Sequence, residues 1–187
     1  MIKYAICGNI ASGKSTTECI LKKHGYDVLD TDFVCHNILD TNNDIKELFK
    51  NYDIFVNGLI SREKLGKIVF SDNILKKKLE NIMHPIVRRE IEKFFNDNSD
   101  KSKLFVSIPL LFEANMQDLF DKIIFVYAND DIRLKRLIER NNYSSEYAKI
   151  RMDSQMSQEE KIKQCDIIIY NNSSIVDLES QILKLVV

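Results

Sequence analysis

The sequence predicts an α/β protein in which a parallel five-stranded sheet is covered by helices on both faces, giving three layers. Five short apolar runs, rich in β-branched and aromatic residues, have the length and composition of buried strands. Helical patterns fill most of the chain between these runs, and strands that alternate with helices form parallel sheets. The expected strands are residues 2–7, 26–30, 104–108, 123–127 and 167–170.

The first strand leads through a glycine-containing turn into a helix. Residues 2–7 are mostly apolar and stop at Gly8, and residues 14–23 have a helical pattern. Gly25 follows at the position where a helix commonly ends on a left-handed residue. The second strand begins directly after it.

Residues 33–98 interrupt this alternation with amphipathic helical runs and no convincing strand. Ser71 has the chemistry of an N-cap for the helix that follows it. Pro85 lacks an amide hydrogen, so we expect it to break or kink that helix near His84. A second amphipathic run begins at Ile86. These residues therefore predict a mainly helical insertion in the α/β core.

Composition excludes several classes of protein. The 187 residues suit one compact unit, and 27 Lys and Arg against 28 Asp and Glu leave no basic excess for nucleic acid. No apolar run approaches the ~20 residues that span a bilayer, and the first residues lack a signal-peptide pattern. We therefore expect a cytoplasmic protein with no nucleic-acid or membrane partner. Nothing in the sequence indicates an oligomeric state.

The cysteines are consistent with a reducing compartment. None of them forms a C-x-x-C pair, and most have apolar neighbours, as small buried hydrophobic side chains do. The adjacent Cys35 and His36 do not by themselves make a four-ligand metal site. The four cysteines are Cys7, Cys19, Cys35 and Cys165.

A phosphate-binding motif follows the first strand. Residues 8–15 read G-N-I-A-S-G-K-S and fit the pattern G-x-x-x-x-G-K-[ST] at every required position. The glycines allow backbone N–H groups to form an anion-binding nest, and the helix that begins near Lys14 adds its positive end. Lys14 is expected to reach the β- and γ-phosphates of ATP, and Ser15 to place a hydroxyl on Mg²⁺. The loop residues expected to bind ATP are Gly8, Ala11, Ser12, Gly13, Lys14, Ser15 and Thr16.

The motif alone does not distinguish a kinase from a switch or a transporter ATPase. The base-reading N/T-K-x-D and the D-x-x-G of GTPases are absent, as is the LSGGQ signature of ABC ATPases. A small chain with a helical insertion and an arginine-rich cap favours a small-molecule kinase, in which a lid excludes water. A non-catalytic nucleotide-binding regulator is the alternative from another class.

Two carboxylates end the second strand. Asp30 and Asp32 are two residues apart, so an extended chain would place both on the same side, with Asp32 further out. One could accept the proton of an acceptor hydroxyl, and the other could hold Mg²⁺ through water.

Arginines mark the start of the expected lid. Arg133, Arg136 and Arg140 share one helical face. Such stripes are usually solvated, but beside a phosphate loop an arginine can stabilise transition-state charge. Arg140 is favoured because the polar segment 140–158, a candidate mobile cap, begins there.

Ordered blocks across nearly the whole chain resemble the dephospho-CoA kinase family. V-L-D-T-D at 28–32 is similar to the family's V-I-D-A-D, L-E-N-I-M-H-P at 79–85 to L-E-x-I-x-H-P, and P-L-L-F-E at 109–113 to the block after its third strand. Further matching blocks are residues 60–66, 69–70, 134–136, Arg140, 151–155 and 165–171.

The resemblance implies a P-loop kinase that uses MgATP to phosphorylate the ribose 3′-hydroxyl of dephospho-CoA. Asp32 would be the base, Lys14 and Arg140 would stabilise the transferring group, and Ser15 and Asp30 would hold Mg²⁺. The resemblance places Asn171 near adenine and places Asp32, Arg62, His84, Arg88 and Leu110 at the acceptor. For His84 a structural role at a helix kink is an equal alternative.

The implied organisation has three parts. The nucleotide-binding core would be residues 1–32, 99–139 and 159–187, the helical acceptor domain 33–98 and the lid 140–158. Another P-loop small-molecule kinase, acting on a nucleotide or a sugar, remains an alternative of the same class.

The chain departs from the family's pattern at five positions, none of which removes a group needed for chemistry. Asn9 and Ala11 replace glycines, Arg133 stands where glutamine is frequent, Ser107 stands where an acidic or apolar residue is common, and Cys165 replaces alanine. Alanine fits the loop if position 11 has a negative φ.

Overall fold

The computed structural model describes residues 1–186, which divide into two compact units. The first unit comprises Met1–Asp30 together with the chain from Phe95 onward, and the second comprises Thr31–Phe94. Within residues 1–186, no helix combines the length and apolar character needed to cross a membrane.

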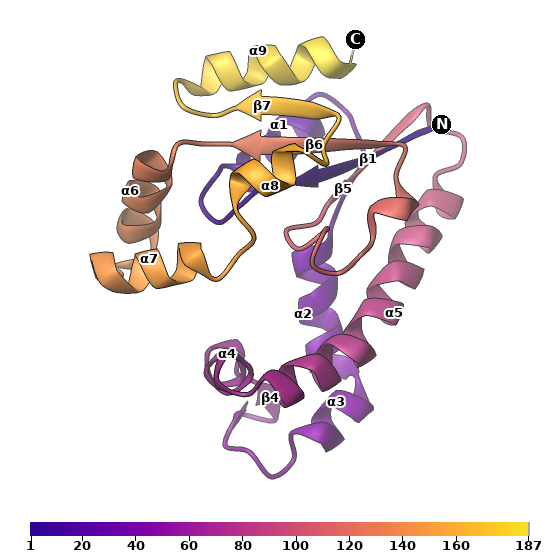
Figure 1. Ribbon diagram of the computed structural model, residues 1–187. Coiled ribbons are helices and arrows are strands. Elements are labelled where there is room, and N and C mark those ends of the chain that lie inside the picture. Colours follow the sequence, from indigo (N-terminus) through magenta and orange to yellow (C-terminus); the bar gives the residue numbers. More distant parts are fainter. Residues whose placement is uncertain (187) are drawn as a thin grey trace. The chain divides into compact units, whose positions relative to one another are not determined.

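The first unit is built on a five-stranded sheet in the order β2-β5-β1-β6-β7, in which every neighbouring pair is parallel (Figure 1). The five predicted strands are confirmed, with bounds that shift by one or two residues in three of them. β1 is central, so the chain that follows it leaves from the middle of the sheet's carboxyl edge. The strands are β1 (Ile2–Cys7), β2 (Val28–Asp30), β5 (Lys103–Ser107), β6 (Lys122–Tyr127) and β7 (Ile167–Tyr170).

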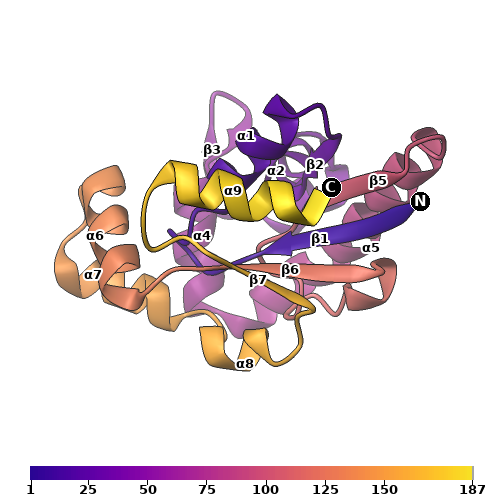
Figure 2. The same ribbon diagram turned by 90° about the horizontal axis from the view of Figure 1, so that it is seen from above.

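Helices cover both faces of this sheet. Tyr4 and Ile6 of β1 lie in one buried cluster with Leu21 of α1 (Lys14–Lys23) and Leu178 of α9 (Ile175–Val186). Because side chains alternate along a strand, Ala5 and Cys7 face the opposite layer. That layer includes α8 (Gln158–Ile162), which contacts β6 and lies across the sheet from α9 (Figures 1 and 2). The three-layer prediction is therefore confirmed.

Two further helices and one helical turn complete the first unit. α6 (Asp130–Asn141) follows β6 and contacts α7 (Ser145–Asp153), and a 3₁₀ turn covers Gln117–Leu119. α7 lies inside the segment expected to be a lid.

The outer edge of β7 is covered by a side chain. Gln181 of α9 accepts a hydrogen bond from the Tyr170 N–H through Oε1 at 2.9 Å and donates one to the Tyr170 carbonyl through Nε2 at 2.8 Å. The amide thus pairs with both backbone groups of Tyr170, as a residue of a neighbouring strand would.

The second unit is mainly helical, as predicted, but it also contains a small hairpin. The two antiparallel strands β3 (Phe55–Val56) and β4 (Leu59–Ile60) enclose Asn57 and Gly58, with φ of 50° and 80°. Asn-Gly is the preferred pair for such a turn because both positions need a positive φ. The helices are α2 (Thr31–Thr41), α3 (Asn43–Leu48), α4 (Arg62–Ser71) and α5 (Asn73–Asp97), the last of which continues into the first unit.

Two local predictions in this region are wrong, and one of the two alternatives of a third is excluded. Ser71 ends α4, and the carboxylate of Asp72 accepts bonds from the amides of Ile74 and Leu75 instead. α5 continues through Pro85, so the proline does not break the helix, and buried Leu79 and Val87 lie on either side of it; the expected kink near His84 stays a prediction. Asp32 is not in an extended chain, because α2 begins at Thr31, directly after β2.

Candidate active site

The loop between β1 and α1 is closely packed. Gly13 has a φ of 104°, which favours glycine, and it ends the loop at the N-cap of α1. A Cβ at Gly8 would stand 2.5 Å from Ser12 Oγ and 2.8 Å from the Val126 carbonyl, so this position also requires glycine. The amide groups at the start of α1 are thus left available for an anion, because no side chain caps the helix.

Ala11 does not have the negative φ that would let an alanine fit this loop without strain. Its φ is 63°, in the left-handed region, so the position suits glycine and the alanine is strained. The cost is about 1–2 kcal/mol. The loop keeps this conformation because other contacts determine it.

Lys14 belongs to a cluster of three polar side chains at the carboxyl edge of the sheet. Its Nζ donates to Ser107 Oγ at 2.6 Å and lies 3.1 Å from Glu18 Oε1. Ser107 Oγ donates to the same Glu18 oxygen at 2.5 Å. Glu18 is 5% exposed and Ser107 is fully buried, so the carboxylate is held away from solvent and beside the ammonium.

The two residues predicted to hold Mg²⁺ lie at the ends of elements that contribute to this cluster or pair with it. Asp30, half-buried at the end of β2, is in register with Ser107 of β5. Ser15 is exposed in the first turn of α1. Mg²⁺ binds through oxygen ligands, usually one or two carboxylates together with waters and substrate phosphates. The donor set fits such an ion, although residues 1–186 contain no group of three or more His, Cys, Asp or Glu side chains arranged to hold a metal.

Asn171 is buried against the loop. Its Nδ2 donates to the Ser12 carbonyl at 2.7 Å, its backbone N–H donates to the Tyr127 carbonyl at 2.8 Å, and its own carbonyl accepts from Arg136 Nη2 at 3.0 Å. A Cβ at Gly13 would stand 1.9 Å from this amide nitrogen. Asn171 therefore supports the shape of the phosphate loop.

The arginines of α6 take different positions. Arg133 is buried, donates from Nε to the Ile10 carbonyl at 3.0 Å and pairs through Nη1 with Asp130 at 2.7 Å. Burial lowers the pKa of its guanidinium, and the Asp130 carboxylate opposes that shift. Arg140 is exposed in the last turn and donates to Asn141 Oδ1. Arg133 thus bonds directly to the loop, whereas Arg140 bonds to its own neighbour in α6.

The loop is also tied to the end of the expected lid. The Ile10 amide donates to Gln155 Oε1 at 2.7 Å, and Asn9 Nδ2 donates to the Met156 carbonyl at 2.9 Å. Neither contact was predicted from the sequence, because 145 or more residues separate the partners and only the fold brings them together. Ser12 Oγ and Arg136 Nη1 are buried with no hydrogen-bond partner among the described residues. Donors of this kind suit an anionic ligand.

The residues expected at the acceptor lie in both units. In the second unit, Arg62 at the start of α4 donates to His36 Nε2 at 2.7 Å, while His84 and Arg88 lie in α5, both half-buried. Leu110 of the first unit is 46% exposed. The Arg62–His36 contact joins a residue of the predicted acceptor set to a histidine that the sequence did not single out.

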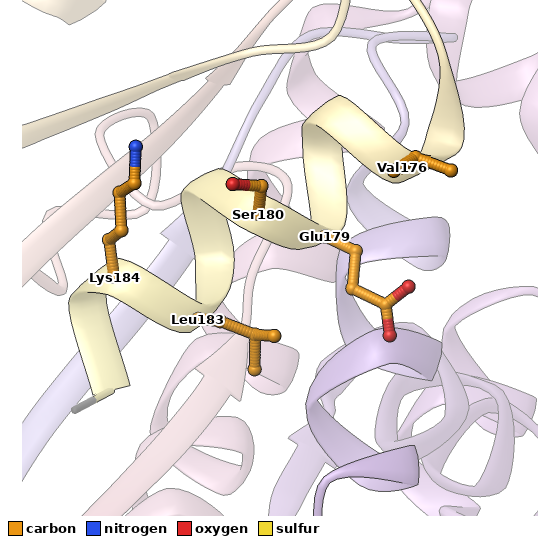
Figure 3. Close-up of a pocket in the computed structure, with 5 residues that line it drawn as sticks. All are labelled: Val176, Glu179, Ser180, Leu183 and Lys184. Atoms are coloured by element: carbon orange, nitrogen blue, oxygen red, sulfur yellow. The ribbon is translucent and has the colours of Figure 1, made fainter.

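A shallow depression on α9 carries none of this chemistry. It is lined by five residues of α9, Val176, Glu179, Ser180, Leu183 and Lys184 (Figure 3). The Glu179 carboxylate accepts hydrogen bonds from Lys23 in α1 and from His24 directly after it. These bonds hold the pKa of Glu179 below its usual range. Residues of the loop do not line it.

A glycine loop at the end of the central strand of a parallel sheet, followed by a helix that begins with a lysine, defines a P-loop nucleotide-binding protein. The family model for dephospho-CoA kinase matches residues 2–177. Because this match covers most of the chain, the chain belongs to the dephospho-CoA kinase family, and it is a kinase.

Individual relatives agree with this assignment. Dephospho-CoA kinase of Sulfurimonas denitrificans is 40% identical over 184 residues, which cover 96% of this chain and 90% of the relative. A solved structure of dephospho-CoA kinase from Campylobacter jejuni is 34% identical, with a TM-score of 0.75 and coverage of 98% and 94%. The crystal structure of TT1252 from Thermus thermophilus is 33% identical, with a TM-score of 0.88 and coverage of 99% and 95%.

Proposed function

We propose that this chain transfers the γ-phosphoryl group of ATP to the ribose 3′-hydroxyl of dephospho-CoA, giving coenzyme A and ADP, the final step of coenzyme A biosynthesis in the cytoplasm. The observation that carries the proposal is the family match over residues 2–177, which includes the complete phosphate loop. A general P-loop kinase would need only the loop, whereas the match extends through the insertion and the segment after β7.

The loop would bind the phosphates of ATP. Backbone N–H groups before α1 face an anion, and the helix adds its positive end. Lys14 supplies a point charge against the γ-phosphate, and the hydroxyls of Ser15 and Thr16 lie in the first turn beside it. The lysine side chain would oppose the negative charge on the transferring group.

Asp32 is the proposed base. In a loose phosphoryl-transfer transition state the proton leaves late, so this carboxylate serves mainly to orient the acceptor hydroxyl and then to take its proton. Asp32 is exposed in the first turn of α2, where a carboxylate is also stabilised by the helix dipole. It is therefore accessible to an acceptor.

Ser15 and Asp30 would hold Mg²⁺ together with phosphate oxygens and waters. When bound, the ion neutralises charge on the β- and γ-phosphates. The carboxylate of Asp30 at the end of β2 supplies the hard oxygen that such an ion prefers.

Arg140 and the lid 140–158 would close over the nucleotide. The bonds from Asn9 and Ile10 to Met156 and Gln155 fix the end of this segment at the loop. Arg140 lies at its beginning, so movement between these points would bring the guanidinium toward the transferring phosphoryl group. Residues 33–98 would bind the acceptor, with Arg62, His84 and Arg88 as candidate contacts and Leu110 on the core side.

An acceptor panel tests the proposal. Purified protein is incubated with ATP and Mg²⁺ and with dephospho-CoA, shikimate, gluconate or a nucleoside monophosphate, and ADP release and product mass are measured. We expect coenzyme A from dephospho-CoA and no product from the other acceptors. Phosphorylation of another acceptor alone would identify a different P-loop kinase, and nucleotide binding without turnover would identify a regulator.

Lys14→Ala is the control for the active site. Loss of one such charged contact with the transition state commonly lowers the rate about 10²–10³-fold. A folded Lys14→Ala variant with unchanged turnover would remove the lysine from its assigned role. The unfolding midpoint of the variant, followed by circular dichroism, shows whether it is folded.

A further inference from the structure

Glu18 is a buried carboxylate to which the proposed mechanism gives no role. It lies one turn after Lys14 in α1, so both side chains project from the same side of the helix. Its side chain is 6% exposed and that of Lys14 is 11% exposed. A carboxylate so far from water is stable only when it is paired and hydrogen-bonded, and here Lys14 and Ser107 provide both contacts.

The three contacts form a closed triangle. Lys14 Nζ reaches Ser107 Oγ at 2.6 Å, Ser107 Oγ reaches Glu18 Oε1 at 2.5 Å, and that oxygen lies 3.1 Å from Lys14 Nζ. Each side chain comes from a regular element, since Ser107 ends strand β5, whose last four residues are buried, and the other two lie in α1. The ammonium is therefore fixed from two directions without any contribution from a nucleotide.

Ser107 connects the Glu18 carboxylate to the sheet through a hydrogen bond. It is in register with Ile6 of β1, the strand that leads into the loop, and with Asp30 of β2. The strand end beside the loop thus carries a hydroxyl rather than an acid. The negative charge that faces Lys14 through this hydroxyl comes from α1.

We propose that Glu18 is a positioning residue for Lys14, supplying from α1, both directly and through Ser107, the charge that holds the ammonium at the edge of the sheet for phosphoryl transfer. The inference rests on the proposed role of Lys14. The carboxylate fixes where the cation stands when ATP arrives, so the rate of transfer depends on it. It does not contribute to ATP affinity, because an anion beside the phosphate site cannot attract the triphosphate.

Glu18→Gln tests the charge while preserving the size of the side chain and its capacity to accept a hydrogen bond from Ser107. We expect kcat with dephospho-CoA to fall about 10-fold or more, while the Kd for ATP stays equal or decreases. A residue that only stabilised the helix would lower the unfolding midpoint and leave kcat of the folded enzyme unchanged. Glu139→Gln is the matched control, because Glu139 forms an exposed i,i+4 pair with Lys135, and it is expected to leave kcat unchanged.

Relocating the carboxylate gives a rescue. Glu18→Ala removes the acid, and adding Ser107→Asp returns one at the strand end that the wild-type hydroxyl occupies. We expect the double variant to recover kcat to within about 3-fold of wild type. The double variant with Ser107→Asn instead, which has the same shape without the charge, is expected to stay as slow as Glu18→Ala.

The outcomes separate this inference from the proposed function. If wild type and Lys14→Ala behave as proposed but Glu18→Gln keeps its kcat, the positioning role is wrong and the function stands. If wild type does not phosphorylate dephospho-CoA, the function fails, and calorimetry with ATP still decides on Glu18, because a loss of ATP affinity of more than about 3-fold in Glu18→Gln overturns the inference. If Glu18→Ala does not fold, the kcat values of Glu18→Gln and of the double variant Glu18→Ala with Ser107→Asp still test the positioning role.

Discussion

Replacing Gly13 by alanine would bring a methyl group onto the amide of Asn171. The added Cβ would stand 1.9 Å from Nδ2 and 3.1 Å from Cγ of Asn171, but 3.8 Å from its Cβ. The amide would have to move, which breaks its 2.7 Å bond to the Ser12 carbonyl. In Asn171→Ala the side chain ends at Cβ, so the methyl group fits. The two substitutions should therefore be strongly coupled.

The expected free energies follow from these contacts. Alanine at a φ of 104° costs at least about 1–2 kcal/mol, and loss of a buried hydrogen bond costs about 1–3 kcal/mol. Gly13→Ala pays both costs, about 2–5 kcal/mol, and Asn171→Ala only the second. The double variant also loses about 2–5 kcal/mol rather than the sum of both singles, because the bond can be lost only once. The coupling energy is about 1–3 kcal/mol.

Urea unfolding of wild type, both single variants and the double variant measures this coupling, provided that the four m-values agree. Gly25→Ala is the control, because Gly25 has a φ of 81° and no atom within 4 Å of an added Cβ, so it carries backbone strain alone. Its effect should add to that of Asn171→Ala. Additivity of the Gly13 and Asn171 substitutions within about 0.5 kcal/mol would refute the contact.

Three other predictions concern the site. Asp32→Asn is expected to lower kcat about 10²-fold with little change in ATP affinity, whereas Asp30→Asn should shift the Mg²⁺ dependence. Steady-state kinetics at varied ATP and Mg²⁺ measures both effects, and the reverse pattern would show that the two residues have exchanged roles. Residues 140–158 are expected to exchange amide hydrogens more slowly when ATP and dephospho-CoA are both bound, and equal protection in the free enzyme would argue against a lid. Ala11→Gly relieves a left-handed alanine and should raise stability by about 0.5–1 kcal/mol in urea unfolding, so a lower midpoint would contradict the strain.

The alternation of apolar runs with helical patterns was sufficient to predict the sheet. All five strands of the sheet are where β-branched and aromatic runs predict them, because strands buried on both faces consist of little else. The hairpin at Phe55–Ile60 was missed although Asn57-Gly58 marks its turn. Strands of two residues are too short to show an alternating pattern.

Tertiary packing explains the remaining differences. Pro85 was expected to break or kink α5; the helix is not broken, since one missing hydrogen bond is offset by the apolar side chains that α5 buries on either side of the proline. Asp32 was placed on an extended chain because β2 was expected to continue outward, whereas α2 begins immediately at Thr31.

The candidate site was predictable where a local motif defines it. Gly8–Ser15 could be identified from its spacing alone. Glu18 was visible as the residue four positions after Lys14, yet its burial depends on Ser107 of β5, a strand 89 residues later that lies beside β1. Arg133 has the sequence context of a solvated stripe, and only the position of α6 beside the loop makes it a partner of Ile10.

The amide of Gln181 also affects how this protein behaves among other copies of itself. Strand β7 ends the sheet, and Tyr170, at its tip, is 51% exposed. An open strand edge offers backbone groups to which a second chain can add, which is a common route to aggregation. Because Gln181 already occupies both backbone groups of Tyr170, an incoming strand would first have to displace the side chain from them. One side chain of α9 thus protects this edge of the sheet against self-templated assembly at Tyr170.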